Sequence, residues 1–308
     1  MSIFVSVAAF CEPLLEFTLD SLFGQADHAG EITVGIVDQS LDDNRQWLVK
    51  KSYWPNVRYL QINPIDSRGV SWARNIAFSL YQDETHLLQI DSHTFFTPGW
   101  DTRLLDSLSF LNKQVEKPIL TTYPPPFEFN AENQPYPTLP PSETIYLLKK
   151  NPETEISETC ATLRFRVEHL FGADYAEGFH IGAGFLFTLG RFVEEIPYDP
   201  FMYFHGEEQN LALRAYTRGW TIFHPKQNAI PLYHLYKQRD NSYVSHHWHP
   251  DYEAQRQTKW VALKKRADER LLALIRGKTP GVYGLGSVRS LDDFFKISGI
   301  DYRPLAKN

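Results

Sequence analysis

Two neighbouring side chains in this sequence have the types and spacing of a metal site. Asp91 ends the largely apolar segment of residues 86–91, and His93 follows it after a single serine. In an extended segment, residues i and i+2 point to the same side, so a carboxylate oxygen and an imidazole nitrogen can reach one ion. That donor pair suits manganese and similar first-row divalent ions better than calcium. The same spacing also fits a capping aspartate beside a solvated histidine, and this alternative stays open.

Basic and acidic residues elsewhere have the chemistry to act beside such an ion. Arg68 and Arg74 lie in the segment DSRGVSWARN. A metal and an arginine can together stabilise the charge that grows on a diphosphate leaving group. A surface salt bridge is the alternative for Arg74. Glu207 and Glu208 begin a helical stretch, where acids also complement the helix dipole without any catalytic role. His234 lies in the apolar stretch IPLYHLY, which is typical of a core histidine.

Alternating strands and helices must position these residues. β-Branched or apolar runs predict strands, and apolar residues at helical spacing predict helices between them. The predicted strands are residues 3–9, 31–37, 57–62 and 86–91, and the predicted helices are residues 14–23 and 70–82. This alternation predicts an α/β fold with a mostly parallel mixed sheet flanked by helices. Ligands bind beyond the carboxyl ends of such strands, so Asp38 and Asp91 both belong to the expected cleft.

A proline-rich segment at residues 122–170 interrupts the regular pattern. Its prolines predict an excursion of the chain over the cleft rather than a linker. Aromatic residues in this excursion offer two readings, a stacking platform for a ligand or ordinary anchoring of the loop; they are Phe127, Phe129, Tyr136 and Tyr146. Beyond the excursion we expect a strand at 183–189, a helix at 206–218, a polar outer helix at 251–276 and a short helix from Leu291.

The composition excludes several classes of protein. The chain has 308 residues, 43% of them hydrophobic, and a net charge of −6, so it is neither disordered nor a basic nucleic-acid binder. Two cysteines cannot build a disulfide framework, which favours a reducing compartment. No apolar run approaches the length of a membrane span, and the first residues lack the pattern of an export signal. These features predict a cytoplasmic protein.

The motifs occur in an order that resembles a known class of enzymes. An acid at a strand end, an A-R-N helix, a DXD-like D-S-H turn, a G-A-G-F strand, a G-E-E helix start and a late histidine follow one another. This order resembles the nucleotide-sugar-dependent glycosyltransferases of the GT-A fold. The closer resemblance is to glycosyltransferase family 60, the polypeptide α-N-acetylglucosaminyltransferases. It is carried by VSVAAFCEPLLEFTL, LLQIDSHTFFTPGWD, LTTYPPP, HIGAGFLF and EEIPYDPFMYFHGEEQNLALRAYTRGW, and the tail GVYGLGSVRSLDDF also matches.

The resemblance implies a retaining transfer of a sugar, expected to be GlcNAc, from a UDP-sugar to an acceptor hydroxyl. Asp91, His93 and His234 would hold Mn²⁺ or Mg²⁺ on the donor diphosphate. Arg74, Glu207 and Glu208 would be the catalytic residues. The implied donor-binding residues are Phe10, Asp38, Arg68, Arg74, Asp91, Gly182, Ala183, Gly184 and Phe185. The acceptor would be a polypeptide hydroxyproline or threonine.

The resemblance also predicts the domain organisation, and the sequence differs from the family pattern at two places. We expect a catalytic domain at residues 1–240 and a C-terminal extension at residues 241–308 packed on it. The first loop reads Phe10-Cys11-Glu12 where the family has Tyr-Arg-Asp, and Val70 stands in place of a proline.

Other functions remain open at this level. The same fold can use another UDP-sugar donor with a glycan or lipid-linked acceptor. It can also hydrolyse nucleotide-sugars, or bind them without turnover. Residues 237–250 are expected to close over the donor as a lid. They hold a cluster of three histidines that we interpret as solvated or lid-like, namely His246, His247 and His249.

Overall fold

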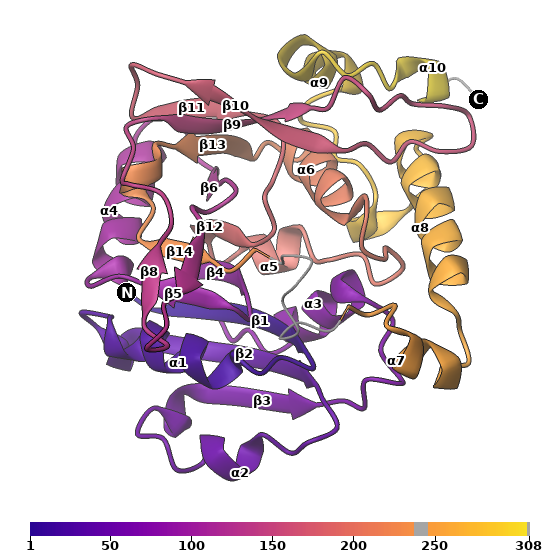
Figure 1. Ribbon diagram of the computed structural model, residues 1–308. Coiled ribbons are helices and arrows are strands. Elements are labelled where there is room, and N and C mark those ends of the chain that lie inside the picture. Colours follow the sequence, from indigo (N-terminus) through magenta and orange to yellow (C-terminus); the bar gives the residue numbers. More distant parts are fainter. Residues whose placement is uncertain (237–245, 307–308) are drawn as a thin grey trace.

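The computed structural model of the protein describes residues 1–236 and 246–306 and confirms the predicted α/β fold (Figure 1). The central sheet of these residues has eight strands. Their order is β11 (Tyr175–Gly178), β13 (Thr221–Pro225), β6 (Pro118–Thr121), β12 (Phe185–Leu189), β4 (His86–Asp91), β1 (Ile3–Phe10), β2 (Ile32–Gln39) and β3 (Val57–Gln61). Strands β4, β1, β2 and β3 run parallel, whereas β12 runs antiparallel to both of its neighbours. The sheet is therefore mixed and mostly parallel.

Strand β1 lies in the middle of the parallel half and sets the register of the acids. Its sequence IFVSVAAF is almost entirely buried, as expected of a strand covered on both faces. Ala8 pairs with Asp91 of β4, and Ala9 pairs with Asp38 of β2. Both acids therefore lie at the same carboxyl edge of the sheet, as the sequence predicted.

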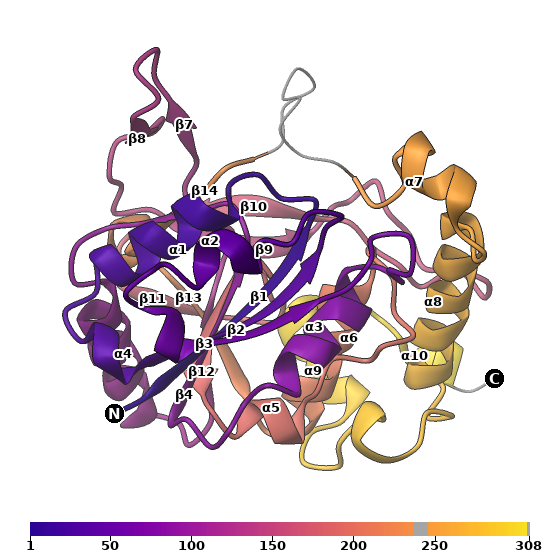
Figure 2. The ribbon, with the colours of Figure 1, turned by 90° about the horizontal axis from the view of Figure 1, so that it is seen from below.

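Helices cover the two faces of the sheet and bury a separate apolar cluster on each (Figure 2). One cluster includes the apolar residues of α1 (Leu15–Gly24) and α4 (Trp100–Asn112). The other includes residues of α3 (Val70–Phe78), α5 (Phe192–Glu195) and α6 (Glu207–Thr217). Each fully buried large apolar side chain contributes roughly 1.5–3 kcal/mol. The second cluster thus holds α3 and α6, which carry the candidate catalytic residues, against one face of the sheet.

The C-terminal part contains α7 (Pro250–Gln255), α8 (Trp260–Ile275), α9 (Leu291–Ser298) and α10 (Arg303–Ala306). Helices α8, α9 and α10 share a third apolar cluster with Leu213 and Tyr216 of α6. The expected division near residue 240 lies outside the described residues. None of the helices in the described ranges combines the length and apolar character needed to cross a membrane.

The prediction of a single helix at residues 251–276 is wrong, because the helix is interrupted between α7 and α8. Arg256 has an extended backbone with ψ of 138°. Its guanidinium donates a hydrogen bond to the carbonyl of Pro64 at 3.0 Å and lies 5.5 Å from the centre of the Phe10 ring. Tertiary contacts of one buried arginine therefore override a helical sequence pattern.

The proline-rich excursion forms two separate hairpins. Strands β7 (Phe127–Phe129) and β8 (Pro135–Pro137) form one that projects from the body in Figure 2, and β9 (Ile145–Lys150) with β10 (Phe165–Leu170) forms the other. Phe127 is buried and packs 5.9 Å from Phe17 and 5.7 Å from Phe95, measured between ring centres. The anchoring interpretation is thus confirmed for Phe127.

Short elements complete the chain. They are the helix α2 (Arg45–Leu48), the strands β5 (Thr94–Phe96) and β14 (Leu232–His234), and 3-10 turns at Ala29–Glu31, Trp54–Asn56, Gln227–Ala229 and Gly281–Tyr283. Strand β14 pairs antiparallel with β5, so that His234 lies opposite Thr94. This pairing carries a residue from far along the chain to the end of β4.

Candidate functional site

Asp91, His93 and His234 lie together at the carboxyl edge of the sheet. Asp91 is the last residue of strand β4, and His93 lies in the turn that follows. The pairing of β14 with β5 brings His234 close to both. One potential ligand atom from each residue lies within 4.8 Å of the other two. His234 Nε2 is 3.0 Å from Asp91 Oδ2, and the two imidazole rings are 4.8 Å apart. The structure therefore brings together the three residues predicted to bind a metal.

The three side chains fit a first-row divalent ion by their chemistry and by the space around them. One carboxylate and two imidazoles are a donor set that such ions accept. Partial burial alone would raise the pKa of Asp91, but the hydrogen bond with His234 and the charge of Arg74 hold that pKa well below its usual range. A Cβ atom on Gly184 would lie 3.0 Å from Asp91 Oδ2, so the glycine keeps this side of the carboxylate open. The site thus offers an ionised ligand with room beside it.

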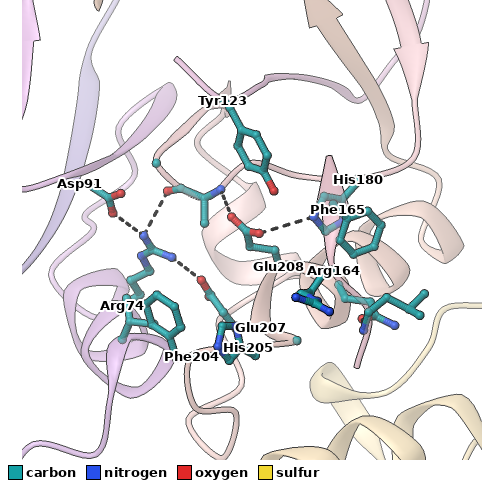
Figure 3. A pocket seen from close by; sticks show the side chains of 16 residues that line it. Arg74, Asp91, Tyr123, Arg164, Phe165, His180, Phe204, His205, Glu207 and Glu208 are labelled. Carbon is teal, nitrogen blue, oxygen red and sulfur yellow. Dashed lines mark hydrogen bonds and ion pairs between the residues drawn. The ribbon is translucent and has the colours of Figure 1, made fainter. Parts of the chain in front are cut away.

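Arg74 links Asp91 to the helix on the other side of the cleft. Its guanidinium donates to Asp91 Oδ1 at 2.7 Å and to Glu207 Oε1 at 2.6 Å (Figure 3). Only 4% of the Arg74 side chain is exposed, so the alternative of a surface salt bridge is wrong. It also donates to the carbonyl of Ala183 at 3.2 Å. The charge of Arg74 is therefore buried and shared between two carboxylates from different elements.

Glu207 and Glu208 both face the cleft but have different surroundings. Helix α6 starts after Gly206, whose positive φ of 84° turns the chain into the first helical residue. Glu207 is buried against Arg74, whereas 28% of the Glu208 side chain is exposed. Glu208 accepts the backbone N–H of Ala183 at 2.7 Å and lies 3.5 Å from His180 Nε2 (Figure 3). These contacts exceed simple complementarity with a helix dipole.

Two pockets meet at Asp91. The first, here called the carboxylate pocket, has a volume of about 320 Å³ and is lined by Arg74, Gly184, Glu207, Glu208 and the ring of Tyr123, among others. The second, here called the aromatic pocket, has a volume of about 390 Å³ and is lined by Phe10, Tyr203, Tyr236, Trp248 and both candidate ligand histidines, among others. Asp91 lines both pockets, as do Val70 and Phe204. An extended ligand can therefore pass from one pocket to the other across the carboxylate.

The predicted donor-binding residues divide into those that line a pocket and those that do not. Phe10, Arg74, Asp91, Ala183 and Gly184 line one or both pockets. The residues outside both linings are Asp38, Arg68, Gly182 and Phe185.

Each of these four residues lies elsewhere for a clear reason. Asp38 is fully buried and accepts hydrogen bonds from Tyr59 and Asn44 at 2.7 and 2.8 Å, while Gln39 lines the aromatic pocket beside it. Arg68 is exposed. Gly182 packs against the backbone of Thr122, and the Phe185 side chain belongs to the apolar core. Donor contacts by these residues stay predictions.

The histidine cluster of the expected lid is partly structural. Residues 237–245 lie outside the described residues, but His247 is within them and lines the aromatic pocket. It shares a hydrogen bond of 2.8 Å with the Tyr203 hydroxyl, and its other nitrogen lies 3.1 Å from the carbonyl of Ser67. Burial lowers the pKa of His247 to about 4. The solvated interpretation is thus wrong for His247, which is a neutral, anchored residue.

Sequence reasoning missed two residues that hold the site. Glu12 lies 2.7 Å from His93 Nδ1, and its sequence signal was only that it stands where the family's first loop has an aspartate. His180 lies beside Glu208 and stacks on Phe165 with ring centres 3.4 Å apart. No sequence spacing predicts the position of His180 in the site, because its partners Glu208 and Phe165 belong to other elements.

The chain is similar to known proteins in sequence and in fold. The family model described as "Glycosyltransferase (GlcNAc)" matches residues 48–282. A crystal structure of GalNAc-T7 with UDP, GalNAc and Mn²⁺ superposes with a TM-score of 0.58 at 13% identity, covering 96% of this chain and 54% of that one. A structure of S. aureus TarS 1-349 gives a TM-score of 0.47 at 16% identity, covering 76% of this chain and 60% of that one. No curated protein matches the sequence.

The similarity to solved structures concerns the fold, which is that of the GT-A glycosyltransferases. The chain spans only about half the length of the GalNAc-T7 chain. The family model, in contrast, covers well over half of this sequence and includes all three candidate metal ligands. The protein therefore belongs to the GlcNAc glycosyltransferase family.

Proposed function

We propose that the protein is a retaining, metal-dependent glycosyltransferase of the family 60 type, which moves GlcNAc from UDP-GlcNAc to an acceptor hydroxyl. The observation that carries this proposal is the position of Asp91. One of its carboxylate oxygens faces His234, and the other accepts a hydrogen bond from Arg74. It lies where the two pockets meet. A diphosphate at this point would have a nucleoside on one side and a sugar on the other.

The donor would lie across both pockets. Its uridine would occupy the aromatic pocket near Phe10, and its sugar would occupy the carboxylate pocket near Gly184 and Glu208. The family description supports GlcNAc as the sugar. The GalNAc-T7 structure, which has this fold and holds UDP, GalNAc and Mn²⁺, supports a UDP donor and a divalent ion. Asp91, His93 and His234 would hold Mn²⁺, or Mg²⁺ in its place.

The residues of the chain would prepare the donor for direct transfer. A bound divalent ion supplies positive charge next to the leaving diphosphate. Arg74 keeps Asp91 and Glu207 in place and adds positive charge to the same region. Glu208 orients a hydroxyl of the sugar or the acceptor by accepting its hydrogen bond. The acceptor oxygen forms its bond to the anomeric carbon on the face from which the diphosphate oxygen departs. That departing oxygen takes the acceptor proton, so no protein base is needed.

We further propose a polypeptide threonine or hydroxyproline as the acceptor and a catalytic domain at residues 1–240 with residues 241–308 packed on it. The acceptor proposal rests on the resemblance to family 60. Glycans and lipid-linked sugars are the competing acceptors. The third apolar cluster, in which α8 and α9 pack on α6, supports a single folded unit that includes the C-terminal extension.

The test is a donor panel with purified protein and Mn²⁺. UDP release is measured with UDP-GlcNAc, UDP-GalNAc and UDP-glucose, with and without a threonine or hydroxyproline peptide, and the anomeric configuration of the product is read by NMR. Asp91→Asn should abolish release from the preferred donor. Asp101→Asn serves as the matched control, because Asp101 is a buried aspartate of α4 that lines neither pocket.

Each outcome decides between the candidate functions. α-Linked GlcNAc on the peptide supports the full proposal. Release of free sugar at the same rate with every acceptor identifies a hydrolase. Donor binding without release of UDP identifies a binding protein, and preference for another nucleotide-sugar corrects the donor.

A further inference from the structure

A buried carboxylate next to the proposed metal ligands has no task in the proposed mechanism. Glu12 follows β1, and only 2% of its side chain is exposed. The chain reaches it through Cys11, which has a positive φ of 46°, an uncommon conformation for a residue with a side chain. A backbone in this conformation costs energy, and here it turns the Glu12 side chain into the protein. The cost indicates that this orientation of Glu12 has a role.

The contacts of Glu12 fix its carboxylate in one orientation. Its Oε1 accepts the backbone N–H of Leu14 at 3.0 Å, and its Oε2 accepts the Ser92 hydroxyl at 3.3 Å. The same Oε2 lies 2.7 Å from His93 Nδ1. The N–H of Leu14 just after the first loop and the hydroxyl of Ser92 in the D-S-H turn therefore hold this carboxylate against the His93 ring.

The bond between Glu12 and His93 determines which ring nitrogen carries the hydrogen. An ionised carboxylate can only accept hydrogen bonds, so Nδ1 of His93 must be the donor. In a neutral imidazole the lone pair is then at Nε2, and Nε2 points away from Glu12. A carboxylate on the far nitrogen of a ligating histidine fixes the ring and raises its basicity. Glu12 cannot serve as a further ligand to the same ion without giving up this bond.

We propose that Glu12 is a positioning residue, which holds His93 in the tautomer and orientation that leave Nε2 available to the divalent ion. The proposal rests on the metal site of the proposed function. It assigns a role to the first loop, Phe10-Cys11-Glu12, in which Glu12 stands where the family has an aspartate.

The test measures Mn²⁺ binding to the whole protein by electron paramagnetic resonance, without donor or acceptor. Glu12→Ala removes the carboxylate, and Glu12→Gln replaces it with a neutral amide that can turn either its oxygen or its NH2 group toward Nδ1. Each should raise the Kd for Mn²⁺ by about 10–100-fold, the usual cost of mutating such a partner. The matched control is Asp101→Asn. Asp101 is also buried and also contacts a histidine, through His28 Nδ1 at 3.3 Å, but it lies outside both pockets. Its substitution should leave the Kd within twofold of the original value.

A second measurement separates positioning from general damage. Nitrogen NMR of histidine-labelled protein should show His93 as a single tautomer with hydrogen on Nδ1, and a mixture in Glu12→Gln. The thermal unfolding temperature of each variant is compared with that of Asp101→Asn. If Glu12→Ala does not fold, the test rests on Glu12→Gln. An unchanged Kd and an unchanged tautomer in Glu12→Gln would overturn the proposal. The metal site itself is judged by Asp91→Asn: if that variant still binds Mn²⁺ as tightly, the proposed function fails, whatever Glu12 does.

Discussion

The two oxygens of Asp91 face regions with different physical character. On one side lies the metal region, made of Asp91 with His93 and His234. On the other lies the ion-pair region, made of Arg74 with Glu207 and the same Asp91. The metal region contains two imidazoles and one carboxylate, and this carboxylate keeps its ion pair with Arg74 when no metal ion is bound. The ion-pair region holds a buried cation whose removal leaves charges without compensation.

This difference separates stability from ligand binding. Loss of His234 from the metal region should weaken ion binding and catalysis while the fold persists, because Asp91 keeps its ion pair with Arg74. Damage to the ion-pair region should lower the free energy of unfolding as well, because burial makes an unpaired carboxylate costly. The predictions below test this separation, starting with the largest expected effect.

Replacement of Arg74 should cause the greatest loss. Arg74→Met fills a similar volume but leaves Asp91 and Glu207 without their cation, which should lower the free energy of unfolding by about 3–5 kcal/mol and abolish UDP release. Urea unfolding gives the stability. Arg191→Met is the control, because Arg191 pairs with Glu116 on the surface and its loss should cost less than about 1 kcal/mol.

A double variant sharpens this result. Burial raises the pKa of Glu207, so this carboxyl is costly to ionise once the charge of Arg74 is gone. Glu207→Gln added to Arg74→Met removes that cost, so the double variant should be more stable than Arg74→Met alone. Equal stability of the two variants would mean that the pair between Arg74 and Glu207 is not what the site depends on.

Loss of His234 should give the opposite pattern. His234→Ala removes a proposed ligand, so we expect the Kd for Mn²⁺ to rise by more than the roughly 100-fold upper cost of losing an outer-shell partner. The free energy of unfolding should fall by less than in Arg74→Met. Electron paramagnetic resonance and urea unfolding measure the two quantities. Tight Mn²⁺ binding by this variant would remove His234 from the metal region.

Glu208 should affect catalysis alone. Glu208→Gln keeps an oxygen that can accept the N–H of Ala183 but removes the charge that faces the carboxylate pocket. A hydrogen bond to a charged group is worth about 1.5–3 kcal/mol, so the rate of transfer should fall by about tenfold or more. Binding of Mn²⁺ should stay within twofold. If Mn²⁺ binding falls in parallel with the rate, the two regions are not separable at Glu208.

Most of the sheet, but only part of the site, was predictable from the sequence. Strands β1, β2, β3 and β4 follow local apolar patterns, and the acids at their ends follow from parallel register. Glu12 is bonded to His93, and Arg74 is buried between Asp91 and Glu207. These contacts join segments that are distant in sequence, so a local sequence pattern cannot predict them. The break at Arg256 has the same origin, because its guanidinium reaches the carbonyl of Pro64.

The smallest effect should come from a methyl group placed on the metal side of Asp91. In Gly184→Ala the new Cβ would lie 3.0 Å from Asp91 Oδ2 and 3.7 Å from His234 Cδ2. The Asp91 carboxylate must then move by a few tenths of an ångström against the hydrogen bond from Arg74. We expect the Kd for Mn²⁺ to rise about threefold, which corresponds to roughly 0.6 kcal/mol.

The matched variant for this change is Gly30→Ala, since no atom lies within 4 Å of the added Cβ at Gly30. It should leave Mn²⁺ binding unchanged. Gly184→Ala could instead lower the free energy of unfolding as strongly as Arg74→Met does. That result would mean that the displaced Asp91 carboxylate has disrupted its ion pair with Arg74. The two sides of that carboxylate would then act as one unit, and a shift of its position at the metal would directly reach Glu207 across the cleft.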